Sequence, residues 1–472
     1  MRITALLVGT SMLAACGGGG ETGVGTAGTT PPPIASTEHT FVKPTQVRTY
    51  RANGALHRYQ YQTRSLLTPD ANGRLAGTTV GQFDQTYAGD ATSVRNSNIS
   101  LTYDPRDAIF SLTIGTNGAG VTLNQRYQDP AHRTDFGGSI GPQFGVPQLD
   151  LPGIQYLQIA SGETNANFAN GRYQLQTPAL RTTAAGTQAA VEDAERFPEA
   201  GEQPRSRFGS IAPGASPPSQ SSTYDRTTFF YQQPGTTTKY VTFAGFLRNN
   251  ITSGRTEVSR PVLDAAGAPV VGANGQPLTE LVSLETLSRY DFTRGVFVFS
   301  EQTINGNVPR TGSGSFRGSL LATSVLNNLR DDISISANQD GPTYFQWIEG
   351  RSAVDVNFGA NTFNIALDGN VHAPIFDFAT TGNHSVRGGA TFAARGSGQI
   401  DLVAAGGFLG QFQQAWFVNP DGNRLNLLIA GSSVDGAFYG PAAEEVGGSF
   451  RIVGGTPDER IDILGVFTGI RQ

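Results

Sequence analysis

The 472-residue chain has little of several features that mark common protein classes. Cys16 is its only cysteine, so no internal disulfide can form and stability must come from burial and backbone pairing. No run of about 20 apolar residues occurs, so a membrane-spanning helix is not expected. Lysine is nearly missing, with Lys43 and Lys239 alone, and the formal net charge of −5 argues against a general nucleic-acid binder.

The motifs of catalytic and metal sites are missing as well. The chain has no G-x-S-x-G elbow, no H-E-x-x-H pair and no Walker loop, so we expect no enzyme, no cofactor and no metal site. His132 stands between Asp129 and Asp135 in a predicted loop, where a turn-stabilising role is more common than catalysis or haem ligation. Residues 421–423 lack the carboxylate series of a calcium site and predict a hairpin turn. The other histidines are scattered: His39, His57, His372 and His384.

What is abundant indicates an all-β fold. The chain has 60 glycines, 26 prolines and few long helical patterns, which favours short strands joined by turns. Residues 99–103 and 110–114 alternate around a proline turn and predict a hairpin. Residues 178–222 have little periodicity and predict a long disordered surface insertion, with room for a helical turn at 189–196. Further strands are predicted at 228–231, 239–246 and 295–299, with a turn-rich loop around 264–267 and 272–275.

From about residue 310 the strand spacing becomes regular. Residues 354–358 and 363–367 form the clearest pair, because their apolar side chains share one face across a short turn. An even-numbered meander of this kind closes into an up-and-down barrel. The eight strands are predicted near 314–323, 351–358, 361–369, 390–397, 411–418, 427–438, 446–453 and 462–470.

Alternation alone does not say which face of this barrel is inside. A transmembrane barrel turns its apolar side chains outward, whereas a soluble barrel packs them into its core. The predicted strands lack aromatic girdles, the chain does not end on an aromatic residue, and a lipid anchor would be redundant on a spanning barrel. These features favour a soluble barrel with a packed core.

The placement of Cys16 predicts a lipid anchor. Arg2, the apolar residues 3–8 and the small residues before the cysteine follow the order of a secretory signal, and Leu13-Ala14-Ala15-Cys16 resembles the bacterial lipobox. We therefore expect residues 1–15 to be a lipoprotein signal peptide and Cys16 to be acylated. The alternative is an ordinary buried cysteine.

The residues after the cysteine predict a tether. In lipoproteins of the kind that this signal resembles, aspartate at the next position marks inner-membrane retention, whereas Gly17 favours the outer membrane. Residues 16–40 are rich in glycine, threonine and proline and have too little apolar character to fold. They are expected to hold the folded part away from the bilayer.

The C-terminal half resembles the transferrin-binding protein B family. The resemblance is carried by the turn that includes Gly436, Phe438, Tyr439, Gly440, Pro441, Glu444 and Glu445, followed by Gly465-Val466-Phe467. Residues 239–245 and 308–318 also resemble the family, the second where its handle domain leads into its barrel. Glycines suit a tight crossing, an aromatic residue can plug the barrel end, and a glutamate can cap the turn.

The resemblance implies a handle-like antiparallel β domain over residues 41–309 and an eight-stranded barrel over 310–472. It further implies an outer-membrane lipoprotein exposed on the cell surface and exported by a Slam-type translocator. Such a protein would bind an iron carrier, haem or another solute and pass it to a TonB-dependent receptor. The chain has room for one lobe where the family has two, which makes transferrin itself a poor candidate. The alternatives are an adhesion or protective lipoprotein without cargo, and a soluble-barrel enzyme or envelope structural protein.

Overall fold

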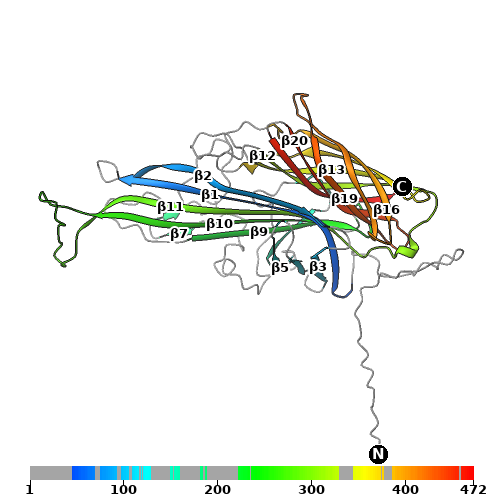
Figure 1. Cartoon of the computed structure of the whole chain (residues 1–472). Coiled ribbons are helices and arrows are strands. Elements are labelled where there is room, and N and C mark those ends of the chain that lie inside the picture. The colour runs from blue at the N-terminus through cyan, green and yellow to red at the C-terminus, as the bar shows by residue number, and fades with distance from the viewer. Residues whose placement is uncertain are drawn as a thin grey trace, which may run out of the picture.

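The computed structural model is built almost entirely from antiparallel strands (Figure 1). Within the part of the chain that it describes, the one helical segment is a 3-10 turn, Asn305–Asn307, and no helix is long and apolar enough to cross a membrane. Cys16, the tether, His39, His132, His384 and nearly all of the 178–222 insertion lie outside the described residues. These are 45–69, 75–92, 97–105, 109–115, 119, 121–128, 149–152, 154–159, 181–183, 186–188, 222–233, 235, 237–328, 344–373, 375–376, 385–456 and 459–472.

The N-terminal part is a sheet that curls back on itself. Its strand order is β11-β10-β9-β6-β5-β4-β3-β1-β2, and β1 also pairs with β11. A separate small pair consists of β7 (Arg181–Thr183) and β8 (Gly186–Gln188). The nine strands are β1 (Arg48–Pro69), β2 (Leu75–Ala91), β3 (Ile99–Asp104), β4 (Ile109–Ile114), β5 (Leu123–Gln128), β6 (Ile154–Ile159), β9 (Ser222–Gln232), β10 (Thr242–Pro261) and β11 (Thr279–Phe299).

The structure confirms the predicted hairpin but not the predicted strand length. The hairpin is confirmed as β3 and β4, with Ile99 opposite Ile114 and Leu101 opposite Leu112 in the core of the curl. The expectation of short strands is wrong for β1, β10 and β11, which have 22, 20 and 21 residues. Their length is maintained because each pairs with long neighbours and because one face of the ribbon packs on the barrel.

The C-terminal part is a closed barrel of eight antiparallel strands, as predicted. Strands follow one another around the ring in sequence order, and β12 pairs with both β13 and β21, which closes it. Two short strands, β15 (Ile375–Phe376) and β18 (Arg424–Asn426), lie alongside β13 and β17. The ring consists of β12 (Ser313–Asn328), β13 (Tyr344–Asn357), β14 (Thr362–Val371), β16 (Thr391–Asp401), β17 (Gly407–Val418), β19 (Leu428–Tyr439), β20 (Glu445–Thr456) and β21 (Glu459–Arg471).

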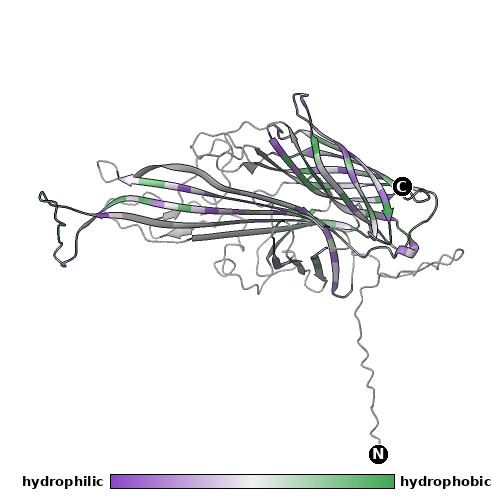
Figure 2. Ribbon diagram, in the orientation of Figure 1, coloured by the Kyte–Doolittle hydropathy of each residue, from purple (hydrophilic) through white to green (hydrophobic). Residues whose placement is uncertain are grey.

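The barrel turns its apolar side chains inward. Along β14, Phe363, Ile365 and Leu367 are buried in the core, while Asn364 between them is exposed. Hydrophobic and hydrophilic residues also alternate along other strands of the barrel (Figure 2). Complete burial of one such side chain contributes about 1.5–3 kcal/mol. The packed-core interpretation of the alternation is therefore confirmed.

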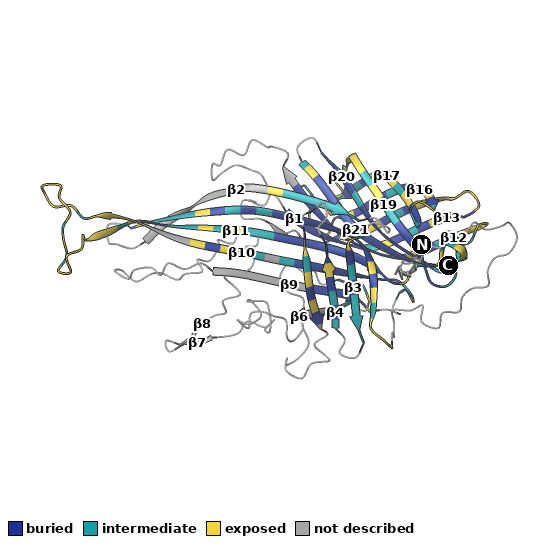
Figure 3. Ribbon diagram, turned by 60° about the horizontal axis from the view of Figure 1, so that its bottom comes forward, coloured by how far each residue is buried: buried dark blue, intermediate teal, exposed yellow. Residues whose placement is uncertain are grey.

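The long strands of the sheet lie against the outer wall of the barrel. Apolar side chains from both parts form one buried cluster, the sheet–barrel contact, in which Phe230 meets Trp347 edge-on at 5.6 Å between ring centroids. Buried residues run along β1, β10 and β11 where these strands pass the barrel, whereas the far end of β10 and β11 is exposed (Figure 3). The sheet contributes Ala55, Phe230, Val241, Phe243, Leu247, Val296 and Val298, and the barrel Leu321, Trp347, Ala437, Tyr439, Leu464 and Val466.

Candidate functional site: the sheet–barrel contact and the hairpin tip

The predicted family motif lies where β19 leaves the barrel and β20 begins. A Cβ atom on Gly436 would stand 2.3 Å from Phe408 Cζ, so only glycine allows that ring to pack there. Phe438 points into the barrel core and contacts the rings of Phe316, Phe358 and Phe408. Tyr439, the next residue, points outward and is buried in the sheet–barrel contact. Adjacent residues of one strand thus serve two cores, because successive side chains alternate between faces.

The turn after β19 requires a glycine. Gly440 has a φ of +88°, and an added Cβ would lie 2.4 Å from Glu444 Oε2 and 2.8 Å from the Tyr240 ring. The residues between β11 and β12 also contact this turn, because Thr303 Oγ1 donates to the carbonyl of Gly440 at 2.6 Å. Asn307 donates to the carbonyl of Pro441 at 3.2 Å. The motif is therefore held from two sides.

Substituting Gly440 by alanine is expected to lower the free energy of unfolding by about 1–3 kcal/mol, through backbone strain and the clash with Tyr240. Gly431→Ala, on the preceding strand β19, is the control, since nothing lies within 4 Å of the position that its Cβ would occupy. Urea denaturation of both variants checks this. Equal stability of the two variants would show that the turn accommodates a side chain.

The two motif glutamates have different roles. Glu444 Oε2 accepts the N–H of Ala442 at 2.8 Å, which is the turn-capping role foreseen for one of them. Glu445 is fully buried and accepts the backbone N–H groups of three successive residues of the sheet: Lys239, Tyr240 and Val241. Burial raises the pKa of Glu445, and these three hydrogen bonds act against that rise by stabilising the carboxylate.

The contact with Glu445 explains why the strand predicted at 239–246 begins three residues later in the structure. β10 starts at Thr242, because the N–H groups of the three preceding residues bind the Glu445 carboxylate instead of a neighbouring strand. A second polar contact fixes the other side, where Asn53 Nδ2 donates to the carbonyl of Asp435 at 3.0 Å and Ser449 Oγ donates to Asn53 Oδ1 at 2.9 Å. The sheet is thus joined to the barrel by residues far apart in the chain.

A group of titratable residues is buried beside the sheet–barrel contact. His57 Nδ1 lies 3.1 Å from Thr323 Oγ1 of the barrel, and the imidazole stacks on Phe345 at 5.6 Å between centroids. Burial and, to a smaller extent, the charges of Arg294 and Arg451 lower the pKa of His57 well below its usual range. Burial also lowers the pKa of Arg294 to about 9. His57 is therefore neutral at physiological pH.

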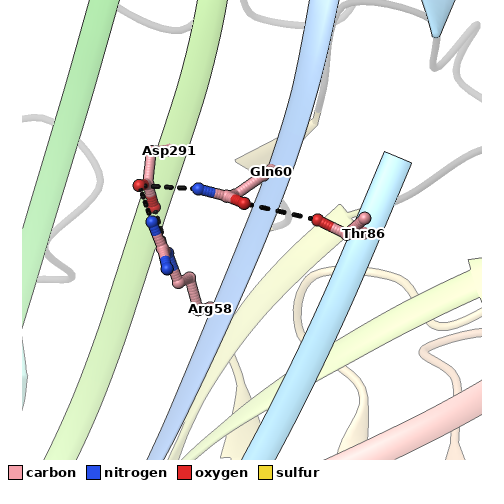
Figure 4. Close-up of polar contacts among 4 residues, drawn as sticks. All are labelled: Arg58, Gln60, Thr86 and Asp291. Atoms are coloured by element: carbon pink, nitrogen blue, oxygen red, sulfur yellow. Dashed lines mark hydrogen bonds and ion pairs between the residues drawn. The ribbon is translucent and has the colours of Figure 1, made fainter. Parts of the chain in front are cut away.

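The opposite face of the long strands is polar and links three strands (Figure 4). Arg58 on β1 forms an ion pair with Asp291 on β11, with Nε 2.8 Å from Oδ1. Gln60 Nε2 donates to the same carboxylate at 2.8 Å, and Thr86 on β2 donates to Gln60 Oε1 at 3.5 Å. The hydrogen bond to Asp291 raises the pKa of Arg58. One face of the ribbon thus packs on the barrel while the other carries a polar network.

Beyond the end of β1, β10 and β11 continue as a two-stranded ribbon and end in residues 262–278, the hairpin tip (Figures 1 and 3). Three of its backbone hydrogen bonds form a closed cycle: Val262 donates to Leu278, Leu278 to Val270, and Val270 to Val262, at 2.7–2.8 Å. Two small loops project from this cycle, one with Gly267 at φ +81° and one with Gly275 at φ +74°. The predicted turn-rich loop is confirmed, and its backbone is internally braced.

The two loops are sequence repeats. Residues 263–270 (LDAAGAPV) and 271–278 (VGANGQPL) match at alanine, glycine and proline positions with a period of eight. Leu263 and Val271 occupy equivalent positions and are each 57% exposed, and Leu278 is 47% exposed. Asp264 is the only charged residue between 261 and 279. The period of eight was the signal in the sequence that would have identified this apolar, charge-poor surface.

The other predicted positions carry no site chemistry in the described residues. Within the described ranges, no group of three or more histidine, cysteine, aspartate or glutamate side chains is placed to hold a metal ion. Residues 421–423 form the predicted hairpin turn, with Gly422 at φ +83° and Asp421 paired with Arg387. His372 Nε2 lies 3.2 Å from the buried Glu349.

Comparison with known proteins gives one family. Residues 308–471 match the model of the C-lobe and N-lobe beta barrels of Tf-binding protein B. No curated protein sequence matches the chain. A mutant of the vaccine antigen transferrin binding protein B from Haemophilus parasuis Hp5 is 13% identical, with 89% of this chain and 76% of that chain covered at a TM-score of 0.26.

Two further solved structures are similar at the same low level. The isotype 1 transferrin binding protein B from serogroup B Neisseria meningitidis is 11% identical, with 91% of this chain and 77% of that chain covered at a TM-score of 0.24. A protein described as a surface lipoprotein is 13% identical, with 38% of this chain and 69% of that chain covered at a TM-score of 0.19.

Proposed function

We propose that the chain is a binding lipoprotein of the bacterial outer membrane, because residues 308–471 match the model of the Tf-binding protein B lobe barrels. Cys16 is its acylated N-terminus, residues 16–40 are its tether, and residues 41–309 form its handle-like domain. It faces the cell exterior, where a Slam-type translocator delivers it. Its ligand is an iron-carrying protein, a haemoprotein or another solute that passes to a TonB-dependent receptor.

The observation that carries a binding role is the hairpin tip. Exposed apolar side chains on a monomeric protein mark interaction surfaces when they gather in one place, and those of the tip stand at the end of a long ribbon. The closed cycle of backbone hydrogen bonds holds the tip in one conformation, so little entropy is lost when a partner docks. The low charge of the tip favours an apolar pocket on that partner.

Binding is tested with four probes on the native lipoprotein in detergent: iron-loaded transferrin, apo-transferrin, haemoglobin and free haem. Replacing Leu263, Val271 and Leu278 together by serine is expected to weaken binding by 10-fold or more for whichever carrier protein the unchanged chain binds. The reason is that a few apolar anchor residues contribute most of the affinity of such interfaces. Surface plasmon resonance gives the affinity. The melting temperature should stay unchanged, since all three side chains are exposed.

The matched control is Leu428→Ser, which removes a 71% exposed leucine from the barrel. It should bind like the unchanged protein. If both variants bind equally well, the tip is not the contact surface. Equal affinities for iron-loaded transferrin and apo-transferrin would favour the second candidate, an adhesion lipoprotein without cargo.

Anchoring and display are tested separately. Mass spectrometry of the mature protein should find acyl chains on Cys16, and Cys16→Ser should release the protein from the membrane fraction. Protease added to intact cells should cut the chain. An intact chain after that treatment would exclude surface display and leave the anchor unaffected.

A further inference from the structure

We propose that the outer wall of the barrel binds a linear acidic polysaccharide through a row of side chains, the arginine–tryptophan stripe. The stripe consists of Arg351 on β13, Asp368 on β14, Arg395 on β16, Trp416 on β17 and Arg424 on β18. It belongs to the barrel, whereas the hairpin tip belongs to the sheet. The proposal therefore does not depend on what the tip binds.

The stripe crosses five neighbouring strands of the barrel wall. β13, β14, β16 and β17 are hydrogen-bonded in that order, and β18 pairs with β17. In the register of these strands Arg351 stands opposite Asp368, and Trp416 stands opposite Asn426. Among the described residues, none from β14, β16 or β17 belongs to the sheet–barrel contact. At a strand spacing of about 4.8 Å the stripe extends roughly 19 Å around the barrel, which suits a ligand of several linked units.

The stripe has an excess of positive charge, because it contains three arginines and one aspartate. Arg395 is balanced, since its Nη2 lies 2.6 Å from Asp368 Oδ1 and its Nη1 donates to the carbonyl of Leu367 at 2.9 Å. Arg351 and Arg424 are exposed at the two ends of the stripe, and no carboxylate of the described ranges lies within 4 Å of either guanidinium. Two separated cations favour a ligand with more than one anionic group.

Arg424 is held in one orientation for such a ligand. Its guanidinium carbon lies 4.3 Å from the centroid of the Trp416 ring, and its Nε donates to Asn426 Oδ1 at 2.8 Å. Asp421, three residues earlier, is paired with Arg387 at 3.1 Å. The two terminal nitrogens of Arg424 are therefore placed to bind a carboxylate, which a planar guanidinium can hold with two parallel hydrogen bonds.

Neutral hydrogen-bonding groups stand beside these charges. A β-bulge next to Arg395 interrupts the register of β16 and β17, and the successive residues Gln413 and Gln414 are both exposed. Bulges re-aim side chains and are frequent beside functional sites. The two amides can donate to and accept from hydroxyl groups, and the half-buried Trp416 ring adds apolar surface.

A polysaccharide fits this combination better than an acidic peptide. β14 and β16 are paired with strands on both sides, so they offer no free edge to an extended peptide backbone. An acidic sugar supplies hydroxyl groups for Gln413 and Gln414, C–H groups for Trp416, and carboxylates for Arg351 and Arg424. Each of these contacts uses a side chain that the barrel already presents to solvent.

The test uses the native lipoprotein in detergent, with oligogalacturonate and oligosialic acid as acidic probes and a maltooligosaccharide as the neutral probe. Calorimetric titration is expected to show saturable binding of an acidic probe that weakens as salt is added, and no binding of the neutral probe. The fluorescence of Trp416 should change on binding, whereas Trp347, the other tryptophan, is buried in the sheet–barrel contact. Failure of both acidic probes to bind, or equal binding of polyglutamate, would overturn the proposal.

Variants locate the binding surface. Arg424→Gln should weaken binding of the acidic probe by about 10-fold or more, because hydrogen bonds to a charged group are lost. Arg317→Gln is the matched control and should bind normally, since Arg317 is also exposed on the barrel but is paired with Asp355 at 2.8 Å. The serine variant of the hairpin tip should also bind the polysaccharide normally, which separates this site from the proposed function. Equal affinities of Arg424→Gln and Arg317→Gln would contradict the assignment.

Discussion

Replacing Glu445 by glutamine is expected to lower the free energy of unfolding by about 2–4 kcal/mol. The carboxylate accepts three backbone N–H groups from the sheet in a fully buried position. Glutamine has the same size, but it offers one acceptor oxygen and turns an NH2 group toward these donors, so buried N–H groups lose their partners. Urea denaturation followed by circular dichroism measures the loss.

Glu444→Gln is the matched control, because Glu444 is the neighbouring residue and its hydrogen bond stays within its own turn. We expect a loss of about 0.5–1 kcal/mol there. Hydrogen exchange adds a local readout: the amides of residues 239–241 should exchange faster in Glu445→Gln and at the normal rate in Glu444→Gln. Equal losses in the two variants would mean that Glu445 does not hold the sheet to the barrel.

Acidification is expected to destabilise the fold through His57. The pKa of His57 is lowered in the folded protein, so the unfolded chain binds more protons once the pH falls below about 6.5. Stability from this group is therefore fully present above that pH. It is lost by up to about 1.4 kcal/mol per pH unit as the pH falls from there toward the folded-state pKa. Urea unfolding between pH 7.5 and pH 4.5 measures the slope.

His57→Gln should flatten this part of the pH profile because the titrating group is gone. Thr323→Val removes the hydrogen-bond partner of the imidazole but keeps the imidazole, so its profile should remain steep. A profile that is unchanged by His57→Gln would assign the acid sensitivity to carboxylates elsewhere in the protein.

The strands of the barrel were predictable because each carries its own alternating pattern. Phe363, Ile365 and Leu367 alternate with polar neighbours, and the face they share in the sequence is the face that is buried. The hairpin of β3 and β4 was predictable for the same reason, since its two strands are joined by a short turn. In both cases the information lies within about fifteen residues.

The N-terminal strands were harder to predict. β1 has buried residues on both faces where it passes the barrel, with Leu56 in the core of the curl and Ala55 in the sheet–barrel contact. A strand that is buried on both sides loses the apolar–polar alternation that identifies strands. The hairpin tip was foreseen as loop, but its internal repeat and exposed apolar side chains were not recognised.

Among the motif residues too, some roles were predictable from the sequence and others were not. Gly440 and Pro441 mark a tight turn in the sequence, and the structure places a turn there with a positive φ. Glu445 looked like a marker of the fold, and nothing near it in the sequence indicates that its partners are residues 239–241. That partnership depends on where two separately folded parts meet.

The sequence by itself determined the eight-stranded meander, the direction of its apolar face and the positions of its turns, because side-chain alternation and turn chemistry act between near neighbours. Only the tertiary structure decided that the sheet curls and packs on the barrel, that Glu445 binds the three residues before β10, and that His57 and Arg294 are both buried. Those contacts join residues hundreds of positions apart in the chain. They stabilise the protein only after the sheet and the barrel have folded and packed together.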